Sequence, residues 1–223
     1  MDTVRTIRVN GSGRLMMKPD LMRLRVTVNG LRKEYDEAVK GSAEKTNEVR
    51  ELLKGFGFDG SELKTAGFDV RAEYTDYEDK NGRRQRRFKG YRFEHRMKLE
   101  FPADNTLLGR LLYAMAHSSA KPELDIEYTV SDRESCRNEL LAKAVKDSRA
   151  KAAAMAEAAG AELGAVMEID CCGEEHGFSS RSRNFPMLMD CCAMDADKGA
   201  CALDMEAEDI VEEEEVSVVW SIA

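Results

Sequence analysis

The stretch that most constrains the fold is an alanine-rich segment that runs through a glycine into an apolar strand, residues 131–170. Ser131 and Glu134 have the spacing of a capping box, in which the serine oxygen accepts the amide of Glu134 and the glutamate reaches back to the amide of Ser131. Gly160 supplies a left-handed helix stop, and residues 161–169 then change from a helical period to a strand period. The helical face expected to lie against a sheet is small and apolar: Leu141, Ala144, Val145, Ser148, Ala152, Met155, Ala156 and Ala159. We therefore expect a helix that packs closely on a sheet and leads directly into a strand.

Length and charge limit the classes of protein to consider. With 223 residues, of which 43% are hydrophobic, the chain can form one sizeable core or two small cores that share an interface. Its formal net charge of −8 argues against a general nucleic-acid binder, because a surface that follows phosphates needs an excess of Lys and Arg. No window approaches the roughly 18 to 20 apolar residues of a spanning helix, so we expect no membrane span.

The amino terminus and the cysteines bear on the cellular compartment. Residues 1–9 alternate charged and β-branched side chains and contain no apolar run followed by a small-residue cleavage site. We therefore expect a cytoplasmic protein, unless a leader has been removed from the sequence. The six cysteines would then lie in a reducing compartment, where free thiols or metal ligands are more frequent than structural disulfides.

Residues 21–130 predict a complete antiparallel unit. The elements expected are, in order, a strand over 21–31, a helix over 34–56, a long hairpin with strands over 66–74 and 91–101 around Asn81-Gly82, a helix over 104–115 capped by Asp104, and a strand over 122–130. This βαββαβ order is the ferredoxin-like split βαβ arrangement, with both helices on one face of the sheet. The sheet residues expected beneath the helices are Leu24, Val26, Phe68, Val70, Phe93, Met97, Leu99, Leu124 and Ile126, and the helices contribute Val49, Leu52, Leu108 and Leu111.

The remaining segments predict a second, smaller lobe. They are a strand over residues 3–10, the alanine-rich helix, the strand after Gly160, and a last strand with Val216, Val218, Trp220 and Ile222 on one face. Residues 173–209 have no sustained period and read as a long loop. We expect an α+β protein, one domain over residues 1–223, with one sublobe over 21–130 and another over 1–20 plus 131–223.

Several short segments, in this order and spacing, resemble the SIMPL-domain family. They are residues 7–13, 18–20 entering a strand, 64–70, 90–91 opening a strand, and 159–164 after the alanine-rich helix. The family contains bacterial proteins of unclear function, including periplasmic immunogenic members in Gram-negative pathogens, and the resemblance covers nearly the whole chain. The chain departs from it in lacking the signal peptide of exported relatives and in its cysteine density between Cys171 and Cys201.

The resemblance implies a two-lobed α+β protein without known enzymatic activity. It also implies a tendency to form homo-oligomers, since ring-like or channel-like assemblies are known in the family, and some relatives are linked to protection against oxidative stress. No catalytic residue and no cofactor come with it.

The glycines and histidines favour structural roles. Gly11-Ser12-Gly13 is interpreted as a turn between two strands, because Pro19 and a strand follow where a phosphate-binding loop would enter a helix. His95 shares an apolar strand face with Phe93 and Met97, which is typical of a core histidine whose hydrogen bonds are satisfied. His117 lies near a helix C-terminus, where its positive charge would be favourable. No nucleophile elbow or marked general base is present, so we expect no enzyme.

The arms of the predicted hairpin carry opposite charges. Asp76, Glu78 and Asp79 precede the turn, and Lys80, Arg83, Arg84, Arg86, Arg87 and Lys89 follow it. Opposite charges would then face each other across the strands, which favours a solvated, self-complementary hairpin. The alternative is a patch for an acidic partner or RNA.

Sulfur-rich residues near the carboxyl end suggest a metal or redox site. The candidate ligands are Cys171, Cys172, Cys191, Cys192, Cys201 and His176. Soft sulfur ligands suit Cu(I) or Zn(II), but adjacent cysteines are not the Cys-x-x-Cys pairs of ordinary zinc sites. The other interpretation is a loop with reduced thiols.

Together these observations predict a non-enzymatic SIMPL-like protein that acts through self-assembly or an unidentified protein partner, without a cofactor. We expect a homo-oligomer formed through the sheet edges and the hairpin from Ala66 to Phe101, part of which should project beyond the small lobe that covers it and expose backbone groups to a second copy. The alternative is a cytosolic thiol-based metal-binding or redox-sensing protein, and a hydrolase comes third.

Overall fold

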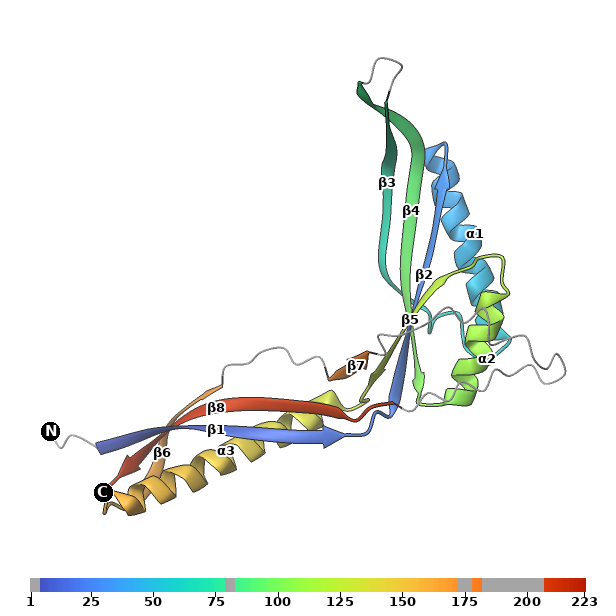
Figure 1. Cartoon of the computed structure of the whole chain (residues 1–223). Coiled ribbons are helices and arrows are strands. Elements are labelled where there is room, and N and C mark those ends of the chain that lie inside the picture. Colours follow the sequence, from blue (N-terminus) through green and yellow to red (C-terminus); the bar gives the residue numbers. More distant parts are fainter. Residues whose placement is uncertain (1–4, 79–82, 172–177, 182–206) are drawn as a thin grey trace. The chain divides into compact units, whose positions relative to one another are not determined.

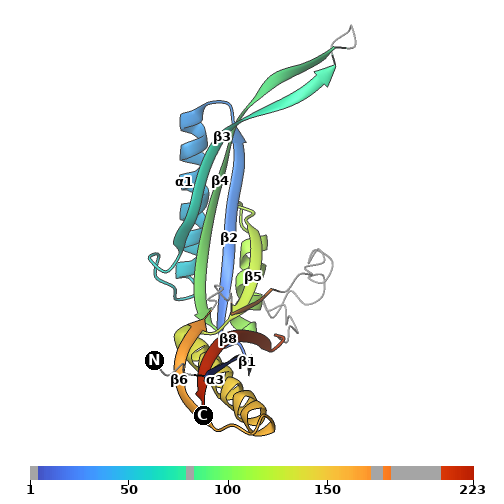
Figure 2. The ribbon, with the colours of Figure 1, turned by 90° about the vertical axis from the view of Figure 1, so that its left-hand side faces the viewer.

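The computed structural model describes residues 5–78, 83–171, 178–181 and 207–223 (Figures 1 and 2). Helices and antiparallel strands alternate along it, so the expected α+β class is confirmed. In the same residues, no helix combines the length and the apolar character needed to cross a membrane.

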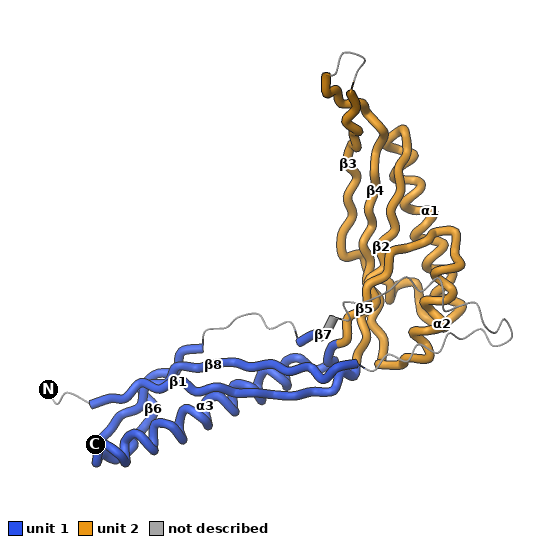
Figure 3. Tube along the Cα trace, viewed as in Figure 1, with its two compact units in different colours: residues 1–20, 129–180, 207–223 blue, residues 21–128, 181–206 orange. Residues whose placement is uncertain are grey.

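The chain divides into two compact units (Figure 3). The first comprises Met1–Asp20, Thr129–Ser180 and Ala207–Ala223, and the second comprises Leu21–Tyr128 and Arg181–Glu206, each as far as its residues are described. The chain leaves the first unit after Asp20 and returns to it at Thr129, so the second unit is inserted between parts of the first.

The second unit has a five-stranded sheet in the order β3-β4-β2-β5-β7. Its elements are β2 (Leu21–Arg32), α1 (Tyr35–Lys54), β3 (Lys64–Glu78), β4 (Arg84–Pro102), α2 (Asn105–Ala116) and β5 (Glu123–Thr129). The strand at the end of the sheet, β7 (Ser179–Arg181), starts in residues assigned to the first unit. Both β2 and β3 pair antiparallel with β4, which lies between them. As expected, Asp104 caps α2, since its carboxylate accepts the amides of Thr106 and Leu107 at 2.9 and 3.0 Å.

The core of this unit lies under the helices. Alternate residues of β2 are buried, as its pattern predicts, and Phe93, Met97 and Leu99 of β4 lie beside them with Ile126 of β5. The helices contribute Val49, Leu108 and Leu111, which are also buried. Two predicted core residues are less covered: Leu52 and Leu124 are only partly buried.

The prediction that Phe68 belongs to the core is wrong, because 49% of its surface is exposed. It lies on β3, the edge strand of the sheet, whereas α1 packs chiefly on β2 and β4. Val70 on the same strand is only partly buried. The alternating pattern of β3 therefore marks a strand face without showing that a helix covers it.

The first unit is a three-stranded sheet covered by one helix. Its order is β1-β8-β6, formed by β1 (Arg5–Met17), β8 (Ile210–Ile222) and β6 (Leu163–Cys171), and α3 (Arg133–Ala158) packs on β1 and β8. The core joins Val9, Val218 and Trp220 to the small residues Ala144 and Ala152 of α3. The Trp220 indole donates to Ser148 Oγ at 3.1 Å.

The interpretation of Gly11-Ser12-Gly13 as a turn is wrong, because these residues lie inside β1. A Cβ on Gly11 would stand 2.1 Å from the carbonyl oxygen of Ala144, and one on Gly13 would stand 2.1 Å from that of Leu140. The glycines therefore let the backbone of α3 approach the strand directly. The Ser12 amide donates to Asp147 of the same helix at 2.8 Å.

The ends of α3 agree only in part with the predicted signals. Gly160 ends the helix with a φ of +69°, as expected. The start is one residue later than predicted, because Asp132 is the cap and accepts the Ser135 amide at 2.9 Å. Ser131 instead donates its amide and its hydroxyl to Asp20, at 2.7 and 2.6 Å, and the hydroxyl bond is the main reason that the pKa of Asp20 is lowered.

Candidate functional site

The outer part of the β3–β4 hairpin is a two-stranded ribbon. β2 pairs with β4 as far as the pair Arg32 and Tyr91. Farther out, Tyr74–Glu78 pairs with Arg84–Phe88, and no third strand joins them within the structure as described. Figure 2 shows this ribbon extending past the end of α1. We call these paired segments, 74–78 and 84–88, the hairpin ribbon.

An irregularity at Gly90 sets the geometry at the base of the ribbon. Gly90 has a φ of +149°, and a Cβ there would stand 2.3 Å from the carbonyl oxygen of Arg32. The register of β3 against β4 shifts between Glu73 and Tyr74 at the same level. In a regular strand, side chains three residues apart point to opposite faces. The bulge brings Phe88 and Tyr91 onto one face, where their rings lie 5.3 Å apart.

Four aromatic rings form a continuous row at this level. Tyr35, the first residue of α1, lies 5.5 Å from Tyr91, and Phe88 lies 5.7 Å from Tyr74, each pair in an edge-to-face arrangement. We call Tyr35, Tyr91, Phe88 and Tyr74 the aromatic row. Three of its members are largely open to solvent: Tyr35 (53%), Tyr74 (48%) and Phe88 (41%). The row leads from the N-terminal end of α1 onto the hairpin ribbon.

Charged side chains surround the aromatic row. The Glu73 carboxylate accepts hydrogen bonds from Arg92 and, at 3.0 Å, from Lys89. These bonds lower the pKa of Glu73 to about 2, and the bond from Arg92 has the larger effect. Asp76 faces Arg86 across the ribbon at 3.6 Å, and the Arg86 guanidinium lies 5.0 Å from the centre of the Tyr74 ring. The prediction that opposite charges face each other across the hairpin is confirmed for Asp76 and Arg86.

The predicted strands end at Tyr74 and begin at Tyr91, and the predicted helix over 34–56 contains Tyr35, but the sequence pattern did not bring these residues together. Their proximity depends on the bulge at Gly90 and on where α1 begins. The sequence held one useful signal, because the predicted hairpin from Ala66 to Phe101 is longer than a typical strand pair.

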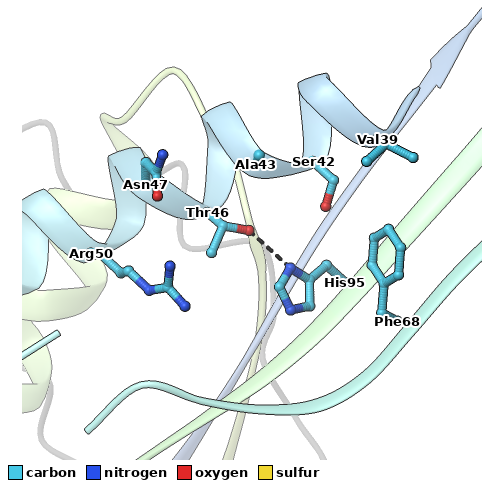
Figure 4. A pocket seen from close by; sticks show the side chains of 8 residues that line it. All are labelled: Val39, Ser42, Ala43, Thr46, Asn47, Arg50, Phe68 and His95. Atoms are coloured by element: carbon cyan, nitrogen blue, oxygen red, sulfur yellow. Dashed lines mark hydrogen bonds between the residues drawn. The ribbon is translucent and has the colours of Figure 1, made fainter. Parts of the chain in front are cut away.

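A groove of about 300 Å³ lies between α1 and the strands β3 and β4 (Figure 4). His95 is at its wall, with Thr46 Oγ1 2.9 Å from Nδ1 and Thr65 Oγ1 2.9 Å from Nε2, so both ring nitrogens are engaged, as expected of a satisfied histidine. Phe68 packs edge-on against the imidazole at 5.4 Å. Burial, and secondarily the charge of Arg50, lowers the pKa of His95, which favours the neutral ring.

The predicted thiol site lies mostly outside the described residues. This applies to Cys172, Cys191, Cys192, Cys201 and His176. Cys171, at the end of β6, is exposed, and its thiol donates to Glu214 Oε1 at 3.4 Å. Among the residues that the structure places, no group of three or more His, Cys, Asp or Glu could hold a metal ion.

The third histidine lies at the C-terminal end of α2. His117 is the C-cap of that helix, with its Nδ1 2.8 Å from the carbonyl oxygen of Tyr113. The prediction that His117 lies near a helix C-terminus is therefore confirmed.

Comparison with known proteins places the chain in a family. The model of the SIMPL family, described as a protein of unknown function (DUF541), matches residues 7–220. The chain belongs to the SIMPL family. The resemblance of residues 7–13, 18–20, 64–70, 90–91 and 159–164 to this family is therefore confirmed.

Two relatives of this SIMPL-family chain come from Brucella. The 26 kDa periplasmic immunogenic protein of Brucella abortus (strain S19) is 27% identical over 163 residues, and that of Brucella melitensis biotype 1 is 26% identical over the same length. The matched segment covers 73% of this chain and 65% of each relative, slightly less than two thirds of their length.

These names contradict the expectation of a cytoplasmic protein, because both relatives are named as periplasmic. That expectation relied on the first residues of the sequence, which do not show whether a leader precedes them. The reducing compartment inferred for the cysteines depended on the same premise and loses its basis.

Proposed function

We propose that this SIMPL-family chain is a non-enzymatic assembly module that binds a second copy of itself through the β3 edge and the hairpin ribbon. The observation that carries the proposal is the aromatic row, which continues onto a ribbon that no other described element covers.

The edge strand provides the first argument. β3 has 15 residues and stands at the end of its sheet, so backbone groups on its outer side are available to another strand. A two-stranded ribbon is also only marginally stable by itself in water. Adding a strand from a second copy would satisfy these groups and stabilise the ribbon, as in other cases of strand addition.

The aromatic row provides the second argument. Large aromatic side chains dominate the energetics of protein interfaces because they bury much area at little entropic cost. Tyr74 and Phe88 expose nearly half of their surface on the ribbon, where the row would form the centre of a contact.

The charges would set the register of such a contact. The β3 arm carries Asp76 and Glu78, and the β4 arm carries Arg84, Arg86 and Lys89. If the outer edge of β3 in one copy meets the free outer edge of β4 in the ribbon of the other, the acidic arm faces the basic arm, which selects one alignment. Exposed ion pairs contribute only about 0 to 1 kcal/mol each, so the aromatic residues would supply most of the affinity. A two-fold contact closes as a dimer, whereas a head-to-tail contact closes as a ring.

Two further observations are consistent with this assignment. His95 lines the groove, and a threonine hydroxyl lies at hydrogen-bond distance from each of its ring nitrogens. Neither nitrogen is therefore free to take a proton from a substrate as a general base. The names of the Brucella proteins support a periplasmic location for this chain as well.

Light scattering coupled to size-exclusion chromatography tests the proposal. The wild-type chain should have a mass that is a multiple of the chain mass at high micromolar concentration. The double variant Tyr74→Ser and Phe88→Ser should weaken association at least about tenfold, since hot-spot truncations cost about 2 kcal/mol or more each.

The matched control is Tyr113→Ser, which removes another exposed tyrosine of the same unit, on α2. It should leave the association constant unchanged. A wild-type chain that stays monomeric at every concentration and salt would contradict self-assembly and leave an unidentified protein partner as the occupant of the ribbon.

A further inference from the structure

The groove beside His95 contains one charged side chain, Arg50, whose Nε has no partner among the described residues. Its Nε–H is buried and donates to no acceptor among the residues that the structure describes, and no ion pair of its guanidinium occurs there either. A buried donor without an acceptor is unfavourable, because it has given up its hydrogen bonds to water without replacement. Figure 4 shows the guanidinium extending from α1 toward His95 at the wall of the groove.

The carboxylates nearest in the chain are occupied elsewhere. Glu51, the next residue of α1, pairs with Lys54 at 2.7 Å, and Glu94, next to His95 on β4, pairs with Arg96 at 3.6 Å. His95 itself holds Thr46 and Thr65 and is favoured in its neutral form. The groove therefore carries a single positive charge that its described surroundings do not balance.

The rest of the lining is mainly apolar. Val39 and Ala43 lie on the exposed side of α1, and the half-exposed ring of Phe68 faces them from β3. Ser42 and Thr46 add hydroxyl groups between these residues and Arg50. A volume of about 300 Å³ is at the small end of ligand sites, which matches a compact molecule.

We propose that this groove binds a small monocarboxylate with an apolar or aromatic substituent, whose carboxylate meets Arg50 and whose substituent lies between Val39 and Phe68. A guanidinium matches a carboxylate in a planar, two-bond geometry. A phosphate dianion would need more than one cation or a set of amide donors, whereas the described lining offers one cation, Arg50, and one side-chain amide, that of Asn47. This site is independent of the hairpin ribbon and of the assembly proposed above.

Titration with phenylacetate, followed by NMR of the full-length chain, tests the site. We expect saturable shifts of Thr46, Phe68 and His95 resonances with a dissociation constant of about 1 mM, the range expected for so small a ligand. Phenylacetamide has the same shape without the charge, and it should bind at least about tenfold more weakly if Arg50 recognises the carboxylate.

Three variants locate the binding. Arg50→Gln should reduce affinity for phenylacetate at least about tenfold, because it removes the charge while keeping hydrogen-bonding groups. Ala43→Trp fills the groove from its exposed helix face and should block binding although Arg50 is kept. Arg110→Gln, whose parent guanidinium lies over Phe56 instead, is the control and should bind as wild type.

The proposal is overturned if phenylacetate and phenylacetamide produce the same shifts, if Arg50→Gln binds like wild type, or if the shifts gather outside the groove. Should Arg50→Gln fail to fold, the comparison of acid with amide and the Ala43→Trp variant still decide. Because the masses in light scattering do not depend on this groove, its failure leaves the assembly proposal untouched.

Discussion

The two long helices cover their sheets to very different extents. In the first unit, α3 has 26 residues and lies on β1, which has 13, so helix and strand have nearly equal lengths of about 40 Å. In the second unit, α1 has 20 residues, about 30 Å, whereas β4 has 19 residues and extends about 60 Å. The uncovered end of β4 is where the aromatic row and the hairpin ribbon lie.

The difference is also visible in the residues that meet each helix. β1 offers glycines at the contact, and the helix backbone approaches until no Cβ would fit. β4 offers Phe93 under α1 and then Tyr91 and Phe88 beyond the helix start. In the first unit, the strand surface under α3 thus carries small residues. In the second unit, large residues of β4 lie under α1 and continue beyond the part of the strand that α1 covers.

Two phenylalanines of the same strand give the largest expected contrast. Phe93→Ala should lower the free energy of unfolding by about 3 to 5 kcal/mol, because Phe93 is 0% exposed and its loss leaves a cavity. Phe88→Ala should cost below about 1 kcal/mol, since 41% of its surface is already in water. Urea denaturation of both variants measures the two values. Equal losses would mean that the outer strand is covered after all.

A methyl group added to a glycine tests the close contact in the first unit. Gly11→Ala should destabilise the chain by about 2 to 3 kcal/mol, because the new Cβ would stand 2.1 Å from a backbone oxygen of α3 and the helix would have to move. Gly60→Ala is the matched control, since the nearest atom there is 3.9 Å away at the end of a lysine. Denaturant melts would contradict the packing if Gly11→Ala proved as mild as Gly60→Ala.

The smallest expected effect is a pH dependence from His95 under α1. Its pKa is lowered in the folded chain, so the unfolded chain takes up the proton first as the pH falls. The free energy of unfolding should therefore decrease below about pH 6.5, the ordinary imidazole value, and level off once the folded chain is also protonated. His95→Gln should remove this part of the slope. The control is His117→Gln at the exposed end of α2, and an identical slope in wild type and His95→Gln would refute the assignment.

Local signals in the sequence identified the elements well. The alternation of β2, the cap at Asp104 and the stop at Gly160 depend on neighbouring residues, and each has the predicted structure. The α+β class and the family also follow from the order of such segments.

Errors arose where the decisive contact is distant in the chain. Ser131 has the spacing of a helix cap, but its amide and its hydroxyl both donate to Asp20. Asp132 therefore caps the helix instead. Gly11 and Gly13 resemble a turn, yet a helix more than a hundred residues later requires them inside a strand. Phe68 has the alternation of a core residue but lies on an edge strand.

The sequence alone therefore determined the type and order of the elements, because helix stops, caps and alternation act over a few residues. Only the tertiary structure decided which surfaces are covered. Whether Phe68 and Phe88 are buried depends on where α1 lies and begins relative to β3 and β4. Among the described residues, Arg50 Nε has no acceptor, while the neighbouring carboxylates Glu51 and Glu94 pair elsewhere. Whether a helix covers a given strand residue depends on how the two elements pack against each other, and the pattern of neighbouring residues in the sequence does not contain that information.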